Sequence, residues 1–121
     1  MLQKVYEYYA IPISNYDGDT IRFDIDLGFN IWLKNESCRL AGIDTYELKD
    51  KDPTKKALAY KAKKLVEDLV TKDERCLLRT YKDKKGKYGR WIVEVFCESL
   101  GSDYSINQKL LDEGLAIPIE Y

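Results

Sequence analysis

The most informative acidic residues of this chain lie in the sequence Asp-Gly-Asp-Thr at positions 17–20. An Asp-Gly pair between two apolar runs predicts a tight turn at Asp17-Gly18. Asp19 has the same parity as the apolar residues of the run that follows, which are Ile21, Phe23 and Ile25. In a strand it would therefore point toward the apolar face, where an unpaired carboxylate is costly. We expect Asp19 to contact a cation or several hydrogen-bond donors.

Two further charged clusters accompany this turn. The sequence RLAGIDTYE, residues 39–47, follows an apolar run and brings an arginine and two acids close together around a glycine. The sequence YKDKKGKYGR, residues 81–90, is a basic segment with two glycines, typical of a hairpin loop. Loops and strand ends that display several charges are common places for a binding or catalytic site.

Together the clusters contain the groups needed for metal-assisted hydrolysis of a phosphodiester. Asp19 and Asp44 offer anionic oxygens to a hard divalent cation, and the carbonyl of Thr45 is a further neutral ligand. Such an ion would neutralise a phosphate oxygen and help to ionise water. We predict a metal site made of these three residues.

The remaining charged side chains have roles in the same chemistry. Glu47 could accept the proton of the attacking water. Arg39 and Arg90 could bind phosphoryl oxygens as negative charge builds in the transition state. We predict these three residues to be catalytic.

The composition excludes several other kinds of site. The chain has no histidine, so Ser-His and Cys-His nucleophiles and histidine-ligated zinc are absent. Cys38, Cys76 and Cys97 fit no zinc spacing and no disulfide framework, and we expect buried thiols. The net charge is −1 at pH 7, so any affinity for a nucleic acid must come from a local basic patch.

The periodicity of the sequence predicts an α+β chain with five strands and two helices. Alternating or β-branched runs predict strands at residues 3–13, 20–26, 30–41, 75–81 and 90–97. The sequence KNES, residues 34–37, predicts a bulge or a projecting hairpin end within the third of them. Pro12 should lie near the end of its strand or at an edge. A helix inserted after the third strand is the layout of an OB-fold barrel, and we expect residues 1–121 to form a single domain.

Both helices show recognisable ends. Asp52 is a predicted N-cap, followed by Pro53 at the first helical position. The second helix is predicted to begin after Ser105 and to end before Gly114. One stripe of the first helix is apolar and consists of Leu58, Ala62, Leu65 and Leu69. Four lysines lie largely off that stripe and are expected on a solvated face: Lys55, Lys56, Lys63 and Lys64.

These motifs, in this order, resemble the staphylococcal nuclease-like (thermonuclease) family. The matching segments are DGDT (17–20), RLAGIDTYE (39–47), KYGR (87–90) and INQKLLDEGLA (106–116), and they span nearly the whole chain. The resemblance implies an OB-fold barrel with packed helices and calcium-dependent cleavage of DNA or RNA, with endonuclease action expected. It assigns the metal ligands, general base and arginines to the same residues named above.

The resemblance also adds substrate-binding residues and shows two departures. Lys87 and Tyr88 match positions beside the bound nucleotide, and Tyr121 falls near a tyrosine that packs on the base in that family. Tyr46 replaces the proline usual before the catalytic glutamate, which removes a restraint on φ. The segment between Asp19 and Arg39 is longer than in the secreted members, which favours a longer hairpin.

Two alternatives to an active nuclease remain open at this stage. The first is a catalytically inactive OB-type module that binds nucleic acid or protein, which the acidic pI of about 5.6 favours slightly. The second is a small structural domain in which Asp19 only caps a turn. No signal peptide and no membrane-length apolar run is visible, so we expect an intracellular, cytoplasmic location, and no obligate protein partner is evident.

Overall fold

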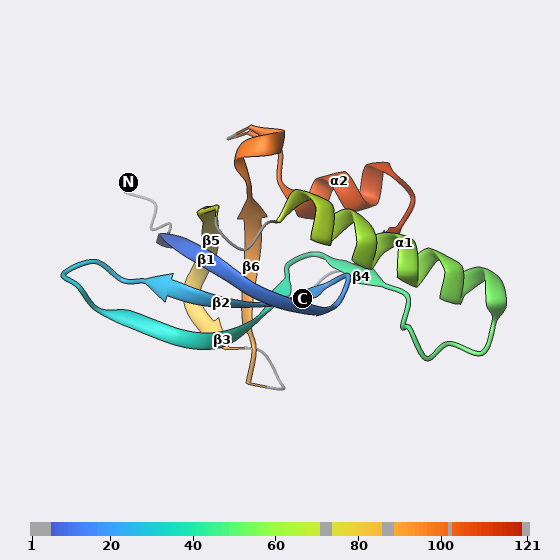
Figure 1. Cartoon of the computed structure of the whole chain (residues 1–121), viewed down its shortest axis with the longest axis horizontal. Coiled ribbons are helices and arrows are strands. Elements are labelled where there is room, and N and C mark those ends of the chain that lie inside the picture. The colour runs from blue at the N-terminus through green and yellow to red at the C-terminus, as the bar shows by residue number, and fades with distance from the viewer. Residues whose placement is uncertain (1–5, 71–73, 86–88, 102, 120–121) are drawn as a thin grey trace.

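The computed structural model describes residues 6–70, 74–85, 89–101 and 103–119. Its elements follow the predicted order, with two additional short strands and one 3-10 turn (Figure 1). In chain order they are β1 (Tyr6–Asp17), β2 (Thr20–Asp26), β3 (Trp32–Leu40), β4 (Ile43–Thr45), α1 (Pro53–Leu69), β5 (Cys76–Lys85), β6 (Trp91–Phe96), η1 (Glu98–Leu100), α2 (Ile106–Asp112) and β7 (Ala116–Pro118).

Five of the strands form a closed barrel in the order β1-β2-β3-β6-β5. Neighbouring strands are antiparallel except at the closure, where Cys38–Leu40 of β3 run parallel to Trp91–Val93 of β6. The predicted α+β fold, a five-stranded OB-type barrel with two helices, is confirmed. The alternating residues Ile21, Phe23 and Ile25 of β2 are buried in the barrel, as their parity predicts.

The largest differences from the predicted strand boundaries are in β1 and in β5, which continues to Lys85, four residues beyond the predicted end at residue 81. β1 continues four residues beyond Ile13, and Pro12 lies inside it rather than near its end. The register with β2 shifts between Pro12 and Ser14, so not every backbone N–H in this part of β1 has a ladder partner. The missing N–H of the proline is therefore tolerated. The predicted irregularity in KNES is present: Asn35 has φ of 55° and interrupts the register opposite β2.

The sequence reading missed the small sheet formed by β4 and β7. Three-residue strands carry too little alternation to be recognised in a sequence. Here Asp44 lies opposite Ile117, and Ile119 donates its N–H to the carbonyl of Gly42 at 2.9 Å. The segment after α2 therefore supports the chain that carries Asp44 and Thr45.

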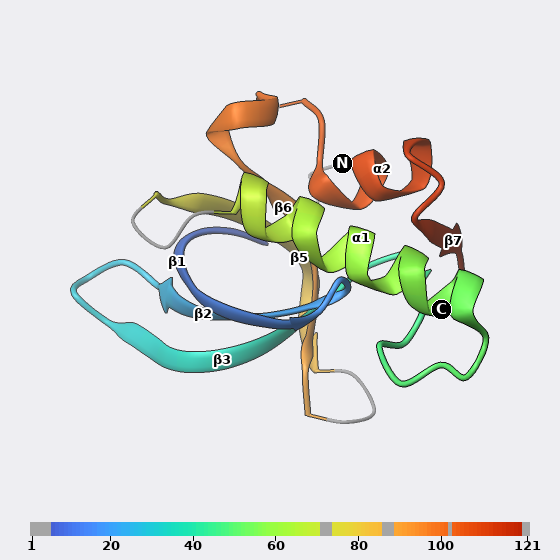
Figure 2. The same cartoon turned by 45° about the vertical axis from the view of Figure 1, so that its right-hand side comes forward.

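Helix α1 lies across one end of the barrel, with α2 beside it (Figure 2). Asp52 caps α1 by accepting a hydrogen bond from the N–H of Thr54, as predicted. The buried face of α1 is centred on Ala59, Ala62 and Val66, while Leu58, Leu65 and Leu69 are only partly buried at its side. Small residues at the centre allow the helix to approach the barrel closely.

Helix α2 brings one buried polar side chain to the closure of the barrel. The Asn107 amide donates to the carbonyls of Ala41 and Val93 and accepts from the N–H of Val95. The predicted cap at Ser105 and the left-handed Gly114 after the helix are both observed. Across the described residues, no helix is long and apolar enough to span a membrane.

Candidate active site

The acidic turn between β1 and β2 is packed directly against α1. The turn residues are Gly18 and Asp19, one position later than the predicted Asp17-Gly18, and Asp17 pairs with Thr20 across the hairpin. A Cβ atom on Gly18 would lie 2.8 Å from the Cβ of Ala62. Glycine is therefore needed here for the close approach of a helix, and α1 in turn holds the carboxylate of the next residue in place.

Asp19 is buried, with 8% of its surface exposed, as its parity predicted. One carboxylate oxygen accepts a hydrogen bond from the N–H of Thr45 at 3.2 Å, and the other accepts from the hydroxyl of Thr20 at 3.4 Å. Its backbone carbonyl accepts from the N–H of Leu40 at 2.9 Å. The turn is thus tied to both β3 and β4.

Arg39 lies between the two predicted metal carboxylates. Its Nη2 atom is 3.0 Å from Oδ1 of Asp44 and 3.6 Å from Oδ2 of Asp19. Its Nη1 atom donates to the carbonyls of Leu40 and Ile43. These contacts fix the tight turn between β3 and β4, so Arg39 positions the acidic residues in addition to any role toward a phosphate.

Two carboxylates of this region, those of Asp44 and Asp17, have a raised pKa. Burial is the largest cause of the raised pKa of Asp44, and the neighbouring charge of Asp19 adds to it, although the Arg39 guanidinium opposes the shift. Burial also raises the pKa of Asp17, with further contributions from the charges of Asp19 and Glu47. Nearby negative charge disfavours ionisation of Asp44 and Asp17, and a cation bound beside them would offset it.

One pocket of about 180 Å³ brings all six predicted metal and catalytic residues together. Its lining is almost entirely polar and consists of Asp17, Asp19, Arg39, Asp44, Thr45, Tyr46, Glu47 and Arg90. Arg90 reaches it from the start of β6, and its Nη1 atom donates to the hydroxyl of Thr20 at 3.2 Å. Glu47 is exposed at the edge, after β4. Segments up to 70 residues apart in the chain therefore converge here.

Two pocket residues were not identified from the sequence as site residues. Asp17 was interpreted only as a turn residue, yet its pairing with Thr20 places it at the pocket. The Asp-x-Asp spacing at a two-residue hairpin turn is the sequence signal that could have identified Asp17 as a site residue. Tyr46, noted only as a replacement for proline, also lines the pocket. The predicted substrate residues Lys87, Tyr88 and Tyr121 lie outside the described residues.

The charge of the pocket suits a divalent cation. Four carboxylates, of Asp17, Asp19, Asp44 and Glu47, face the guanidinium groups of Arg39 and Arg90, which leaves a formal charge of −2. Within the described part of the chain, no three acidic or cysteine side chains converge into a ready-made metal cage. A hard cation held by two carboxylates and a carbonyl would complete its coordination with water, which Ca²⁺ and Mg²⁺ commonly do.

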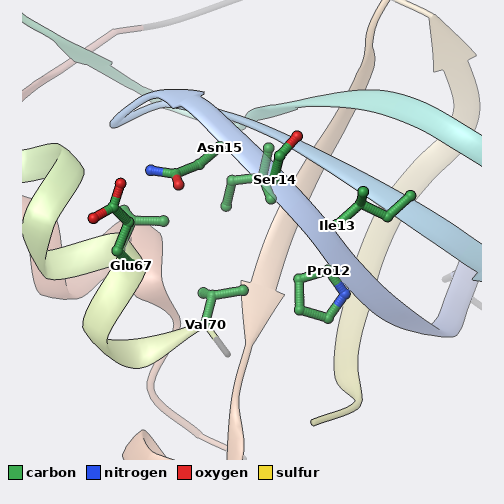
Figure 3. Close-up of a pocket in the computed structure, with 8 residues that line it drawn as sticks. Pro12, Ile13, Ser14, Asn15, Glu67 and Val70 are labelled. Carbon is green, nitrogen blue, oxygen red and sulfur yellow. The ribbon is translucent and has the colours of Figure 1, made fainter. Parts of the chain in front are cut away.

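A larger pocket of about 540 Å³ lies elsewhere, between β1 and the C-terminal half of α1 (Figure 3). Pro12, Ile13 and Val70 give it a largely apolar wall, with Glu67 as its acidic residue. It contains no guanidinium group and no pair of carboxylates. Its chemistry does not match the charged clusters, so the smaller polar pocket is the candidate active site.

Comparison with known proteins identifies the family. Residues 37–121, more than half of the chain, match the model of the staphylococcal nuclease homologue family. No curated protein matches the chain. The matched region contains Arg39, Asp44, Thr45, Glu47 and Arg90, and the fold adds the Asp17–Asp19 turn that precedes it. The polar pocket, the closed barrel and this match together show that the chain belongs to the staphylococcal nuclease homologue family.

Proposed function

We propose that the chain is a metal-dependent nuclease that hydrolyses phosphodiester bonds of DNA or RNA, acting as an endonuclease in the polar pocket. The observation that carries the proposal is the convergence of three aspartates, a glutamate and two arginines in one small cavity of formal charge −2. Membership of a family of nuclease homologues supports the same reaction.

Asp19, Asp44 and the backbone carbonyl of Thr45 would hold the cation, which we expect to be Ca²⁺ because all three ligands are oxygen donors. Both carboxylates contact the same Nη2 atom of Arg39, and burial together with the charge of Asp19 raises the pKa of Asp44, so a bound cation would offset the repulsion between the two acids. The hydroxyl of Thr45 is buried and has no hydrogen-bond partner among the described residues, so it is available to bind water. The bound ion supplies charge neutralisation at the phosphate and a more acidic water.

The other residues would carry out the proton transfer and bind the phosphate. Glu47, exposed at the edge of the pocket, would accept a proton from the attacking water. Arg90, held by Thr20, would donate hydrogen bonds to the phosphoryl oxygens, where charge accumulates in the transition state. Arg39 would share its Nη2 group between Asp44 and the phosphate, while its Nη1 group stays on the β3–β4 turn.

Digestion of plasmid DNA and of single-stranded RNA with Ca²⁺, Mg²⁺ or EDTA tests the proposal. We expect cleavage with a divalent cation and none with EDTA. Glu47→Gln should lower the rate by about 10²–10⁴-fold, the usual contribution of a general base. Arg90→Ala should lower it by about 10²–10³-fold. Glu98→Gln, an exposed acid of η1, is the matched control and should cleave normally.

Failure of the folded wild-type chain to cleave either nucleic acid with any divalent cation would contradict the proposal. That result would favour the non-catalytic OB-type binding module instead.

A further inference from the structure

Helix α1 has an uneven distribution of charge along its length. From Pro53 to Val66 its charged residues are all lysines, at Lys55, Lys56, Lys61, Lys63 and Lys64, and acidic residues appear only at its end, as Glu67 and Asp68. The whole chain has a net charge of −1, so this basic segment is not part of a generally basic surface.

The order of these charges is unfavourable for the helix itself. The first turn contains no acidic residue but has Lys55 and Lys56, and the last turn contains no basic residue but has Glu67 and Asp68. Each charge placed at the wrong end of a helix costs roughly 0.3–1 kcal/mol against the macrodipole. Helix stability therefore does not explain why lysines occupy the N-terminal part of α1.

Part of this basic segment lies beside the candidate active site. α1 contacts the acidic turn at Ala62, and the carbonyl of Lys63 accepts a hydrogen bond from Asn15 near the end of β1. The positive charges of Lys63 and Lys49 both act on Asp17, which lines the polar pocket. These two contacts place Lys63 beside the pocket.

Lys56 extends the same side of the helix away from the pocket. It precedes Lys63 by seven residues, which is close to two full turns, so the two side chains project in nearly the same direction. The rise over seven residues is about 10 Å. Lys56 and Lys63 are named here the lysine track; Lys55 projects about 100° away from Lys56 around the helix axis. Among the described residues, no ion pair involves either lysine of the track.

The other two lysines of α1 are placed differently. Lys64 is paired with Asp68 at 3.1 Å, one turn later in the helix. Lys61 and Lys64 line a surface hollow together with Glu113, on the side of α1 that faces the end of α2. They carry the same charge on the same helix without adjoining the pocket, and so provide a matched control.

We propose that the lysine track binds the backbone of a single-stranded polynucleotide next to the phosphate that occupies the polar pocket. The inference rests on the proposed nuclease function. A track of about 10 Å accommodates at least two phosphates, given a spacing of about 3.4 Å per phosphate along one strand of a duplex. Lysine suits this role because it neutralises phosphate as a point charge without reading sequence.

Equilibrium binding of a fluorescent single-stranded oligonucleotide in EDTA, at several salt concentrations, tests the track without requiring catalysis. Each phosphate contact on a single strand contributes about −0.7 to the slope of log K against log salt concentration. The double variant Lys56→Gln/Lys63→Gln should therefore reduce the steepness of the slope by about 1.4. The double variant Lys61→Gln/Lys64→Gln, with the same loss of charge, should leave the slope at its wild-type value.

Two results would overturn the track. One is an equal loss of slope in both double variants, which would mean a general charge effect. The other is wild-type binding without salt dependence. Hydrolysis of a dinucleotide with Ca²⁺ separates the two proposals. If the wild-type chain cleaves the dinucleotide but the two double variants have the same salt slope, the nuclease proposal stands and the lysine-track proposal is wrong. If the double variants differ in salt slope but the wild-type chain cleaves no substrate, the lysine-track proposal stands and the nuclease proposal is wrong.

Discussion

Asp19 and Asp44 place two carboxylates around the guanidinium group of Arg39. Their exposure differs: the Asp19 side chain is 11% exposed, whereas that of Asp44 is 50% exposed. The buried member is held by two hydrogen bonds, and the exposed member faces the opening where a hydrated cation or a phosphate would arrive. On the proposed function, Asp19 would be a fixed ligand of the cation and Asp44 an adaptable one.

The role of Asp19 can be tested through metal binding alone. We expect Ca²⁺ to raise the melting temperature of the wild-type chain, because a ligand at 100 times its Kd stabilises the folded state by about 2.7 kcal/mol. Asp19→Asn should lose most of this Ca²⁺-dependent increase in scanning calorimetry, and so should Asp19→Ala. Asp103→Asn, at an exposed position, should keep it. A full increase in the Asp19 variants would contradict its assignment as a ligand.

The buried thiols give a prediction for the pH dependence of stability. Burial raises the pKa of Cys38 and that of Cys76 from 9.0 to about 12. Above pH 9 the unfolded chain releases thiol protons that the folded chain retains, so their contribution to stability is complete below pH 9 and is lost as the pH rises toward 12. We expect the free energy of unfolding to fall over that range, and the three cysteines to react with a thiol reagent only after denaturation. Rapid labelling of the native chain at pH 8 would contradict this.

At the scale of elements, the contact between the β1–β2 turn and α1 determines where Asp19 lies. The turn itself is short and carries no apolar residue of its own. Its position comes from the small side chain of Ala62 above it and from the ladder to β3 below it. The helix and the turn should therefore respond to mutation as one unit.

Gly18→Ala tests this contact. The added Cβ meets Ala62 Cβ at 2.8 Å and the backbone of Ala62 at 3.3 Å, so we expect a loss of about 1–3 kcal/mol in urea unfolding, typical of overpacking. Combining it with Ala62→Gly should recover part of the loss, because the double variant removes the closest clash. Additive losses in the double variant would show that the two residues do not compete for the same space.

The hairpin between β2 and β3 projects to one side of the barrel, at the left of Figure 1. Its tip is a type I′ turn: Phe29 and Asn30 have φ of 55° and 60°, and Ile31 donates its N–H to the carbonyl of Gly28. Phe29 is 97% exposed, so burial of its ring does not offset the free-energy cost of its left-handed backbone conformation. The segment between Asp19 and Arg39 thus forms a hairpin, as predicted, and its tip is apolar.

Phe29→Asn should stabilise the chain. A left-handed residue other than glycine or asparagine costs about 1–2 kcal/mol, and asparagine adopts this conformation more readily. We expect a gain of about 1 kcal/mol in urea unfolding for this substitution. Ile31→Asn, another exposed apolar residue of the same tip without a positive φ, should give no such gain. A loss of stability in Phe29→Asn would mean that the ring makes a contact within the folded chain.

At the scale of the whole molecule, closure of the barrel and assembly of the site occur in the same place. The parallel contact of β3 and β6 spans three residue pairs; Arg39 belongs to the middle pair, and Arg90 directly precedes Trp91 of the first pair. Asn107 of α2 satisfies backbone groups on both sides of this contact, at Ala41, Val93 and Val95. One buried amide therefore connects the second helix, the closure and the turn that leads to Asp44.

Asn107→Ala would leave three buried backbone groups without this partner. Each unsatisfied buried group costs about 1–3 kcal/mol, and we expect a total loss of at least about 2 kcal/mol in the free energy of unfolding. The increase in melting temperature caused by Ca²⁺ should also become smaller. Gln108→Ala, at the neighbouring exposed position, should change stability by less than about 0.5 kcal/mol. Equal effects of the two substitutions would contradict a bridging role.

Local signals in the sequence determined much of the fold. The alternation of β2, the caps at Asp52 and Ser105 and the left-handed Gly114 depend on neighbours within a few residues, so they are readable from the sequence. The same holds for the identity of the charged site residues, because their types and local clusters already indicate phosphate and metal chemistry. The three-residue strands β4 and β7 were missed because their pairing joins segments that lie far apart in the chain.

Only the tertiary structure decided how the charged residues meet. The sequence could not show that Arg39 contacts both carboxylates, that Asp17 joins the pocket, or that Gly18 is required by a helix more than 40 residues later. Each of these depends on the closure of the barrel and on the seating of α1, which are long-range packing events. Residue type and local pattern specify which groups are available, whereas their distances and charges come from packing between segments remote in sequence.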